Sequence, residues 1–401
     1  MRLTVLALFV SLVTACGDQL KAGRCETDSD CAQGLSCSQD LVANVYHRCI
    51  QPDAGTGGAG GAAGNDGGGA DMTMRECSAD RDCPADRPTC GANGMCGACS
   101  AGSNGCSTSH PSTPACGPNG ACVECAADAD CSSAAKPACD PKANTCGPCM
   151  SDADCAGRSG PGVCMSHQDG RCASDAETIY VQQTATCATA ADPSAGTSNN
   201  PFCGADKAAV ALSTSRRLIV IRGTVQGASW TLQGSTGDPQ VTIIGQQTGT
   251  IAGGASPGLQ LVGANVFLRD LVVTLSAQIG ISASGGSTVR LDHVRIDTNR
   301  GGGLLLDSSS FDVKDTTIAG NGPGLLAGDV TWGGIRVQNT PTNAMATFEG
   351  ITVQGNLGPG ILCTTPVTGT SVSAANNSTT DIGPTCGIAS CGAPSATCGA
   401  M

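Results

Sequence analysis

Short apolar stretches recur at a regular spacing through the second half of the chain. β-forming residues first appear at 178–181, 218–221 and 241–244, and a period of about 22–23 residues then follows. Three short strands in each period predict an all-β fold, a parallel β-helix whose turns stack on one another. Each period opens on a glycine followed by an apolar residue: Gly258, Gly280, Gly303, Gly334 and Gly360.

A single alignment of these periods collects similar side chains into columns. Two apolar columns are expected to face the core: Leu268, Leu291, Val313, Phe348, and Val273, Ile296, Ile318, Val353. With turns about 4.8 Å apart, an amide ladder is expected along a third column: Ser276, Asn299, Asn321, Asn356. Neighbouring turns should also attract one another through a column of side chains that alternate in charge: Arg269, Asp292, Lys314, Glu349. Beside it runs a polar column, the turn column, expected to be exposed: Asp270, His293, Asp315, Gly350.

The first half of the chain is a cysteine repeat. Four tandem units of four cysteines each fill residues 77–173, and a detached unit lies within residues 16–50. Residues 77–172 contain no Phe, Trp, Tyr, Leu or Ile, so apolar burial there cannot offset the entropy of ordering the chain. Disulfides within each unit are therefore predicted to supply the stability. Four cysteines allow three pairings, and the sequence leaves the choice open.

The same units contain patterns that suit other chemistry. Cys146-Gly-Pro-Cys149 matches the thioredoxin active-site motif, but two other joints also read Cys-x-x-Cys, which favours a structural role. Paired Cys-x-x-Cys motifs can hold zinc, and Asp-x-Asp pairs such as Asp80 and Asp82 can bind Ca²⁺. We favour disulfides over zinc, and carboxylates that cap the turn backbone over Ca²⁺. No metal or other cofactor is therefore predicted, with Ca²⁺ as the alternative.

The N-terminus predicts export. Residues 1–15 combine Arg2, an apolar run and small residues before a cleavage site, which is the pattern of a secretory signal. The sequence Val13-Thr14-Ala15-Cys16 resembles a bacterial lipobox, which implies a lipid on Cys16. Gly17 after it implies sorting to the Gram-negative outer membrane or cell surface. We expect an exported monomer that meets the membrane through this lipid, and the net charge of −12 argues against a nucleic-acid partner.

Two further resemblances concern the domains. Cys25-Glu-Thr-Asp-Ser-Asp-Cys31 resembles the Dickkopf/colipase-type cysteine-rich module, which implies a disulfide-rich shape. The Gly/Ala-rich residues 51–76 after it predict a flexible linker. Residues of about 178–385, from Ile179-Tyr-Val onward, resemble pectin-lyase-like proteins, which implies a right-handed parallel β-helix in a domain at 174–385. Disulfide cysteines are expected at its entry, at its exit and in a C-terminal tail, 386–401: Cys187, Cys203, Cys363, Cys386, Cys391 and Cys398.

Two functions remain open. Relatives of this fold often cleave acidic polysaccharides, but the motifs of polygalacturonase-like and pectin-methylesterase-like sites are absent. One polar cluster is a candidate catalytic site: Asp270, Asp292, His293, Arg295 and Asp315. The charge column explains the same residues without catalysis. We therefore favour a non-catalytic role, in which a disulfide-rich stalk presents the β-helix to carbohydrate or matrix, over a surface-anchored polysaccharide lyase or hydrolase.

Overall fold

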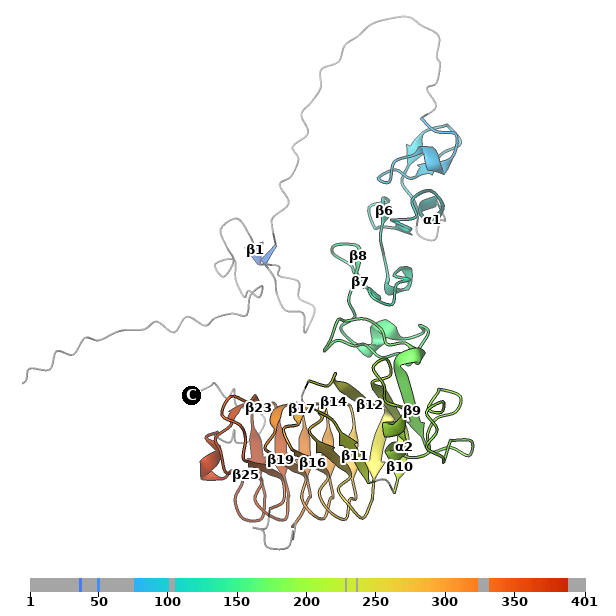
Figure 1. Ribbon diagram of the computed structural model, residues 1–401. Helices are drawn as coiled ribbons and strands as arrows, with labels where there is room; N and C mark the ends of the chain where they lie inside the picture. The colour runs from blue at the N-terminus through green and yellow to red at the C-terminus, as the bar shows by residue number, and fades with distance from the viewer. Residues whose placement is uncertain are drawn as a thin grey trace, which may run out of the picture. The chain divides into compact units, whose positions relative to one another are not determined.

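The computed structural model describes residues 36–37, 49–50, 76–100, 105–227, 229–235, 237–323 and 332–388 (Figure 1). Contacts divide the chain into two units, Met1–Thr73 and Met74–Met401. In the first, β1 (Ser36–Cys37) pairs antiparallel with β2 (Cys49–Ile50). The predicted signal, Cys16, Cys391 and Cys398 lie outside the described residues. None of the helices in the described part of the chain has the length and apolar character needed to cross a membrane.

Each tandem cysteine unit is held by two disulfides with one shared connectivity. The first cysteine bonds to the third and the second to the fourth, which settles the pairing that the sequence left open. The bonds are Cys77–Cys90, Cys83–Cys96, Cys99–Cys116, Cys106–Cys122, Cys125–Cys139, Cys131–Cys146, Cys149–Cys164 and Cys155–Cys172. Three units contain a small antiparallel strand pair: β3 (Thr89–Cys90) with β4 (Cys96–Gly97), β5 (Ala115–Cys116) with β6 (Cys122–Val123), and β7 (Ala138–Asp140) with β8 (Thr145–Gly147).

The Asp-x-Asp pairs cap backbone groups, as the sequence indicated. They lie in short 3₁₀ turns, η2 (Asp80–Asp82), η3 (Asp128–Asp130) and η4 (Asp152–Cys155). In η2, Asp80 accepts the amide N–H of Cys90 at 2.8 Å, and Asp82 accepts the amide N–H groups of Ser78 and Ala79 at 2.9 and 3.0 Å. The same bonds recur in η3 and η4. The unit at Cys99, whose sequence lacks the Asp pair, has helix α1 (Gly105–Ser109) instead.

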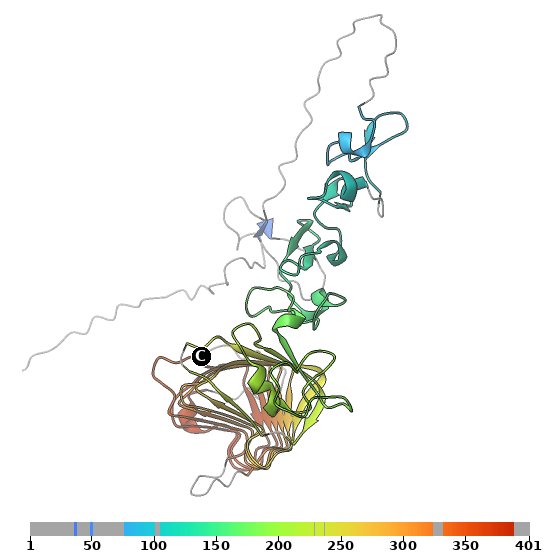
Figure 2. The ribbon, with the colours of Figure 1, turned by 45° about the vertical axis from the view of Figure 1, so that its right-hand side comes forward.

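The strands described between residues 178 and 375 form the β-helix. Its strands are all parallel and form a 13-stranded and a 6-stranded sheet, stacked coil upon coil (Figure 2). The larger sheet starts with β9 (Thr178–Gln182), β10 (Leu218–Gln226) and β12 (Val241–Ala252). It continues as two series on either side of a bend. The first series is β14 (Asn265–Arg269), β17 (Thr288–Asp292), β20 (Ser310–Lys314), β23 (Ala346–Glu349) and β26 (Thr368–Thr370). The second is β15 (Val272–Thr274), β18 (Arg295–Asp297), β21 (Thr317–Ala319), β24 (Thr352–Gln354) and β27 (Ser373–Ala375).

The smaller sheet supplies the third strand of each coil. Its members are β11 (Trp230–Gln233), β13 (Leu259–Val262), β16 (Ile281–Ser284), β19 (Leu304–Asp307), β22 (Ile335–Gln338) and β25 (Ile361–Cys363). A cap of α2 (Ala205–Ala208) and η6 (Ala209–Ala211) lies at the entry, where Cys187 is bonded to Cys203. At the exit, Cys363 is bonded to Cys386 of η7 (Pro384–Cys386).

The predicted register of the columns is confirmed. Leu268 pairs with Leu291, and Leu291 with Val313, in a core where each is at most 1% exposed. In the amide ladder, the Oδ1 atom of Asn321 accepts both the backbone N–H and the Nδ2–H of Asn299, at 3.0 and 2.9 Å. Asn356 binds Asn321 in the same way, and the ladder continues to Asn377, which the sequence alignment missed. Asp381 ends it by accepting from Asn377 at 2.9 Å.

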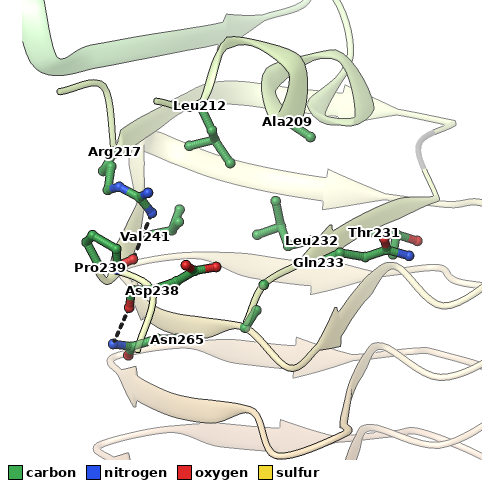
Figure 3. A pocket seen from close by; sticks show the side chains of 12 residues that line it. Ala209, Leu212, Arg217, Thr231, Leu232, Gln233, Asp238, Pro239, Val241 and Asn265 are labelled. Atoms are coloured by element: carbon green, nitrogen blue, oxygen red, sulfur yellow. Dashed lines mark hydrogen bonds between the residues drawn. The ribbon is translucent and has the colours of Figure 1, made fainter. Parts of the chain in front are cut away.

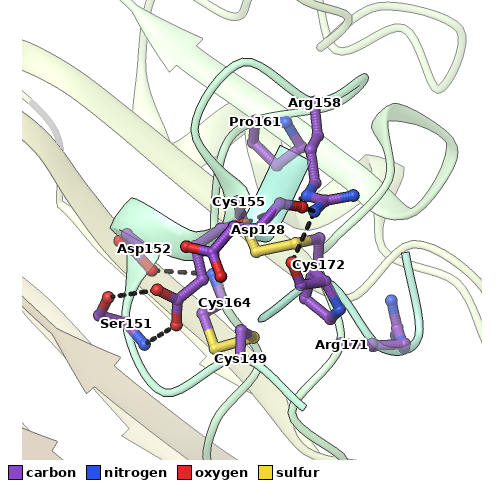
Figure 4. Close-up of a disulfide and its surroundings, with 12 residues drawn as sticks. Asp128, Cys149, Ser151, Asp152, Cys155, Arg158, Pro161, Cys164, Arg171 and Cys172 are labelled. Atoms are coloured by element: carbon purple, nitrogen blue, oxygen red, sulfur yellow. Dashed lines mark hydrogen bonds between the residues drawn. A yellow bond between two sulfur atoms is a disulfide. The ribbon is translucent and has the colours of Figure 1, made fainter. Parts of the chain in front are cut away.

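The last cysteine unit, unit four (residues 149–172), packs on the outer face of the first coils. Val163 and Met165 are buried against three outward-facing residues of the entry strands, Tyr180, Val220 and Ile244. Farther along the outer face the side chains become charged: Phe267 is followed in register by Arg290 and then Asp312. Figure 4 shows the two disulfides of unit four, both of which are buried. The change from apolar to charged marks the limit of the surface that unit four covers.

We expect Leu291→Ala to destabilise the protein by about 2–5 kcal/mol, because the stacked coils cannot close around the lost methyl groups. His293→Ala, two residues away, should cost no more than about 0.5 kcal/mol, since it removes an exposed side chain. Urea unfolding of the oxidised full chain compares the two variants. Equal losses for both would contradict the inward and outward assignment of this strand.

Candidate functional site

The turn column is built by the bend between the two strand series. Asp270, His293, Asp315 and Gly350 each form this bend with a left-handed backbone, at φ values of 55°, 53°, 43° and 65°. Asp and His are among the residues that tolerate this conformation, and glycine adopts it freely. The bend repeats once per coil, so the polar side chains stack along one corner. The His293 side chain is 62% exposed, as the sequence predicted.

Four of the five predicted cluster residues lie together at this corner. The Nδ1 atom of His293 lies 2.7 Å from Oδ1 of Asp292. One ligand atom each from Asp292, His293 and Asp315 lies within 4.8 Å of the others, close enough to share a metal ion. Two carboxylates and an imidazole are ligands that divalent transition metals accept. Arg295 is instead on β18, beyond the bend, where its Nε donates to Asp297 at 2.6 Å.

Arg269 is the residue whose partners differ most from the charge-column prediction. Its register with Asp292 is as predicted, but the guanidinium turns toward unit four. It donates to Asp152 at 2.6 Å and to the carbonyl of Cys164 at 3.2 Å, and it lies 3.1 Å from Asp270. Farther along the column, Lys314 contacts Glu349 at 3.1 Å, as the alternation of charge predicts. A nearly buried guanidinium needs hydrogen-bond acceptors close to it. Unit four provides two of them, the carboxylate of Asp152 and the carbonyl of Cys164.

A groove of 340 Å³ lies where unit four meets the turn column. On the β-helix side it is lined by Arg269, Asp270, Asp292 and His293, and on the other side by Met150, Ser151, Asp152 and Ser166. Burial raises the pKa of Asp270, and the negative charges of Asp152 and Asp292 act in the same direction, while Arg269 opposes them. The groove is therefore polar and crowded with carboxylates. Asp152 could not be assigned to it from sequence, because it comes from another repeat.

His167 is a second residue that sequence reasoning missed. Its ring lies 4.2 Å from that of Phe267, and its Nε2 is hydrogen-bonded to Thr242 at 3.0 Å. Burial between unit four and the β-helix lowers the pKa of His167 to about 4, and the positive charges of Arg269 and Arg290 add to this effect. One feature of the sequence pointed to a covered surface here. The entry strands are apolar on their outer face as well, whereas a strand with one face in solvent alternates apolar and polar residues.

Acidification is expected to weaken the packing of unit four. The pKa of His167 is about 6.5 when unfolded and about 4 when folded, so the unfolded chain binds the extra proton first. The stability that this residue contributes is full above pH 6.5 and falls as the pH drops toward 4. Urea unfolding of the wild-type chain and of His167→Gln, whose amide can still reach Thr242, measures the difference. If the free energy of unfolding depends on pH in the same way in the two proteins, the loss of stability does not come from His167.

Comparison with known proteins gives one match. Residues 194–379 match the family model described as the right-handed beta helix region. Together with the strand order, this shows a right-handed parallel β-helix within the matched residues, the fold that the sequence predicted. Comparisons with curated proteins and with solved structures found no match.

Proposed function

We propose that this chain is an exported protein, held at a Gram-negative outer membrane or cell surface by a lipid on Cys16, with a non-catalytic binding or structural role. Its ligand would be carbohydrate or matrix. The observation that carries the export proposal is the set of disulfides in the tandem units. Eight bonds hold residues 77–172, which contain no Phe, Trp, Tyr, Leu or Ile, and such bonds persist in oxidising compartments.

The non-catalytic role is supported by what the polar cluster does within the protein. Arg269 joins unit four to the β-helix through Asp152 and the Cys164 carbonyl. Arg295 is paired with Asp297 away from the groove. The guanidinium of Arg269 lines the groove, but it is already engaged by Asp152, Asp270 and the Cys164 carbonyl. Arg269 thus has a structural role in positioning unit four, and within the cluster His293 is paired with Asp292 and Arg295 with Asp297, without a need for catalysis.

Replacement of the proposed lipid acceptor tests the anchor. Cys16→Ser should move the protein from the membrane fraction into the soluble exported fraction, because several acyl chains are needed for stable attachment. Cys25→Ser, a matched change in the neighbouring unit, should leave the membrane association intact. If Cys16→Ser remains in the membrane fraction after a carbonate wash, the lipoprotein proposal is wrong.

A polysaccharide lyase or hydrolase is the second candidate, and the carboxylate-lined groove is the observation that favours it. The soluble Cys16→Ser protein is incubated with a panel of acidic polysaccharides, with and without Ca²⁺. Retention on an immobilised polysaccharide measures binding, and new reducing ends or unsaturated uronate products measure cleavage. Binding without products supports the non-catalytic role. Products that disappear in a folded His293→Ala variant would establish the enzyme instead.

A further inference from the structure

Strand β11 (Trp230–Gln233) is the first strand of the smaller sheet and pairs with β13. The backbone N–H of Trp230 donates to Gly258, at 3.3 Å, and that of Gly234 to Val262, at 3.0 Å. Hydrogen bonds of a parallel strand alternate between its two neighbours, so the backbone groups of Thr231 and Gln233 face the opposite, open side. Among the described residues, no strand pairs with this side of β11.

A slot runs along this open edge. The cavity has a volume of 460 Å³ and lies between β11 and the entry cap (Figure 3). Ala209 and Leu212 of the cap form one wall, and Thr231, Leu232 and Gln233 form the other. Proteins usually protect an open strand edge with proline, lysine or a bulge, or they cover it with a helix or loop. Helix α2 of the entry cap lies close to β11, but the slot remains between Ala209 and Leu212 of the cap and the edge of the strand. The sequence of β11, Trp-Thr-Leu-Gln, contains neither proline nor lysine, and its register with β13 is unbroken.

The slot also carries one charge of each sign. Arg217 lies on its wall, held by a hydrogen bond of 2.8 Å from Nη1 to the Pro239 carbonyl. Asp238 lies beside it, with Oδ2 accepting the Ser235 N–H at 2.7 Å. Figure 3 shows the Asp238 carboxylate directed toward the space between β11 and the cap. With no net charge, the slot does not select an ion of one sign. Its donors, acceptors and aliphatic wall complement a peptide backbone with an aliphatic side chain.

We propose that this slot binds an extended peptide segment of a partner protein, which adds a strand to the open edge of β11. The main chain of the peptide would bond to the backbone groups of Thr231 and Gln233, as in other cases of strand addition. An aliphatic side chain would pack against Ala209 and Leu212. Charged side chains of opposite sign on the peptide would pair with Arg217 and Asp238. This interaction is separate from the carbohydrate or matrix binding proposed above.

The test begins with random heptapeptides displayed on phage and selected on the full oxidised chain. Enriched peptides are synthesised, and their affinity is measured by fluorescence anisotropy. Thr231→Pro removes a backbone N–H that faces the slot, and it should weaken binding by about tenfold or more. Thr231→Val keeps that N–H and is the matched control, with affinity expected within about twofold of wild type. Thermal unfolding verifies that both variants fold.

A second measurement uses only the wild-type protein, in case Thr231→Pro does not fold. N-methylation of alternate amides of the selected peptide should abolish binding at the positions that face β11 and leave it intact at those between. The absence of enriched peptides, or affinity unaffected by N-methylation at every position, would overturn the proposal. Concentration-dependent dimerisation that Thr231→Pro abolishes would also overturn it, because a second copy of the chain would then be the occupant.

Discussion

Reduction of the disulfides is expected to abolish the protease resistance of residues 77–172. Each bond closes a loop of 13–17 residues, and a loop of about 15 residues contributes about 3 kcal/mol in the loop-entropy model. No apolar core remains to hold the units once these bonds are broken. Limited proteolysis with and without a thiol reductant, followed by mass spectrometry, locates the cleavage sites.

The loss of protease resistance should differ between the four units. In unit four all four cysteines are at most 4% exposed, whereas Cys90 and Cys116 of the earlier units are partly exposed. Unit four should therefore resist the reductant longest, because its bonds are shielded and its Val163 and Met165 pack on the β-helix. A chelator is the control and should leave the cleavage pattern unchanged. Loss of resistance in the chelator alone would mean that a metal ion holds these units.

The parts of the fold that were predictable from sequence are those that repeat. Leu291 and Asn321 could be assigned because each coil must place the same kind of side chain at the same point of the turn. A register error of one residue would have turned Leu291 outward and brought Arg290 into the core. The continuation of the ladder to Asn377 was missed because the strands of that coil, Thr368–Thr370 and Ser373–Ala375, lack the large apolar residues by which the earlier coils were aligned.

Contacts between different repeats were not predictable in this way. Cys149 could have paired with any of the other three cysteines of its unit, and only the three-dimensional structure selects Cys164. The packing of unit four on β10 is reflected in one feature of the sequence, the unbroken apolar run at 218–221. Such a run indicates burial on both faces but does not identify the covering segment.

In the candidate site, too, the residues that follow the repeat were predictable from the sequence and the others were not. Asp270, Asp292, His293 and Asp315 were grouped correctly because they follow the coil period. Arg295 was grouped with them by closeness in sequence, and the left-handed bend at His293 separates it from them. Asp152 and His167 were missed because their sequence positions bear no relation to the period. Residues that come from a packed neighbouring module need the structure to be found.

Asn321→Ala is expected to be the most damaging single substitution in the β-helix. The Asn321 side chain is fully buried, its Nδ2 donates to the Ile296 carbonyl and to Asn356, and its Oδ1 accepts two bonds from Asn299. Alanine would leave several of these groups without a partner, and each unsatisfied buried group costs about 1–3 kcal/mol. We expect a total loss of about 3–6 kcal/mol, because at least two such groups cannot reach water.

The matched control is Asn265→Ala, which removes the same side chain from the start of β14. Asn265 makes one long hydrogen bond, 3.5 Å from Nδ2 to the Asp238 carbonyl, and lies near the surface. This variant should lose no more than about 0.5 kcal/mol. Urea unfolding of both variants in the oxidised full chain gives the comparison. If Asn321→Ala costs no more than Asn265→Ala, the amide ladder does not stabilise the stacking of the coils, and the apolar columns alone hold them together.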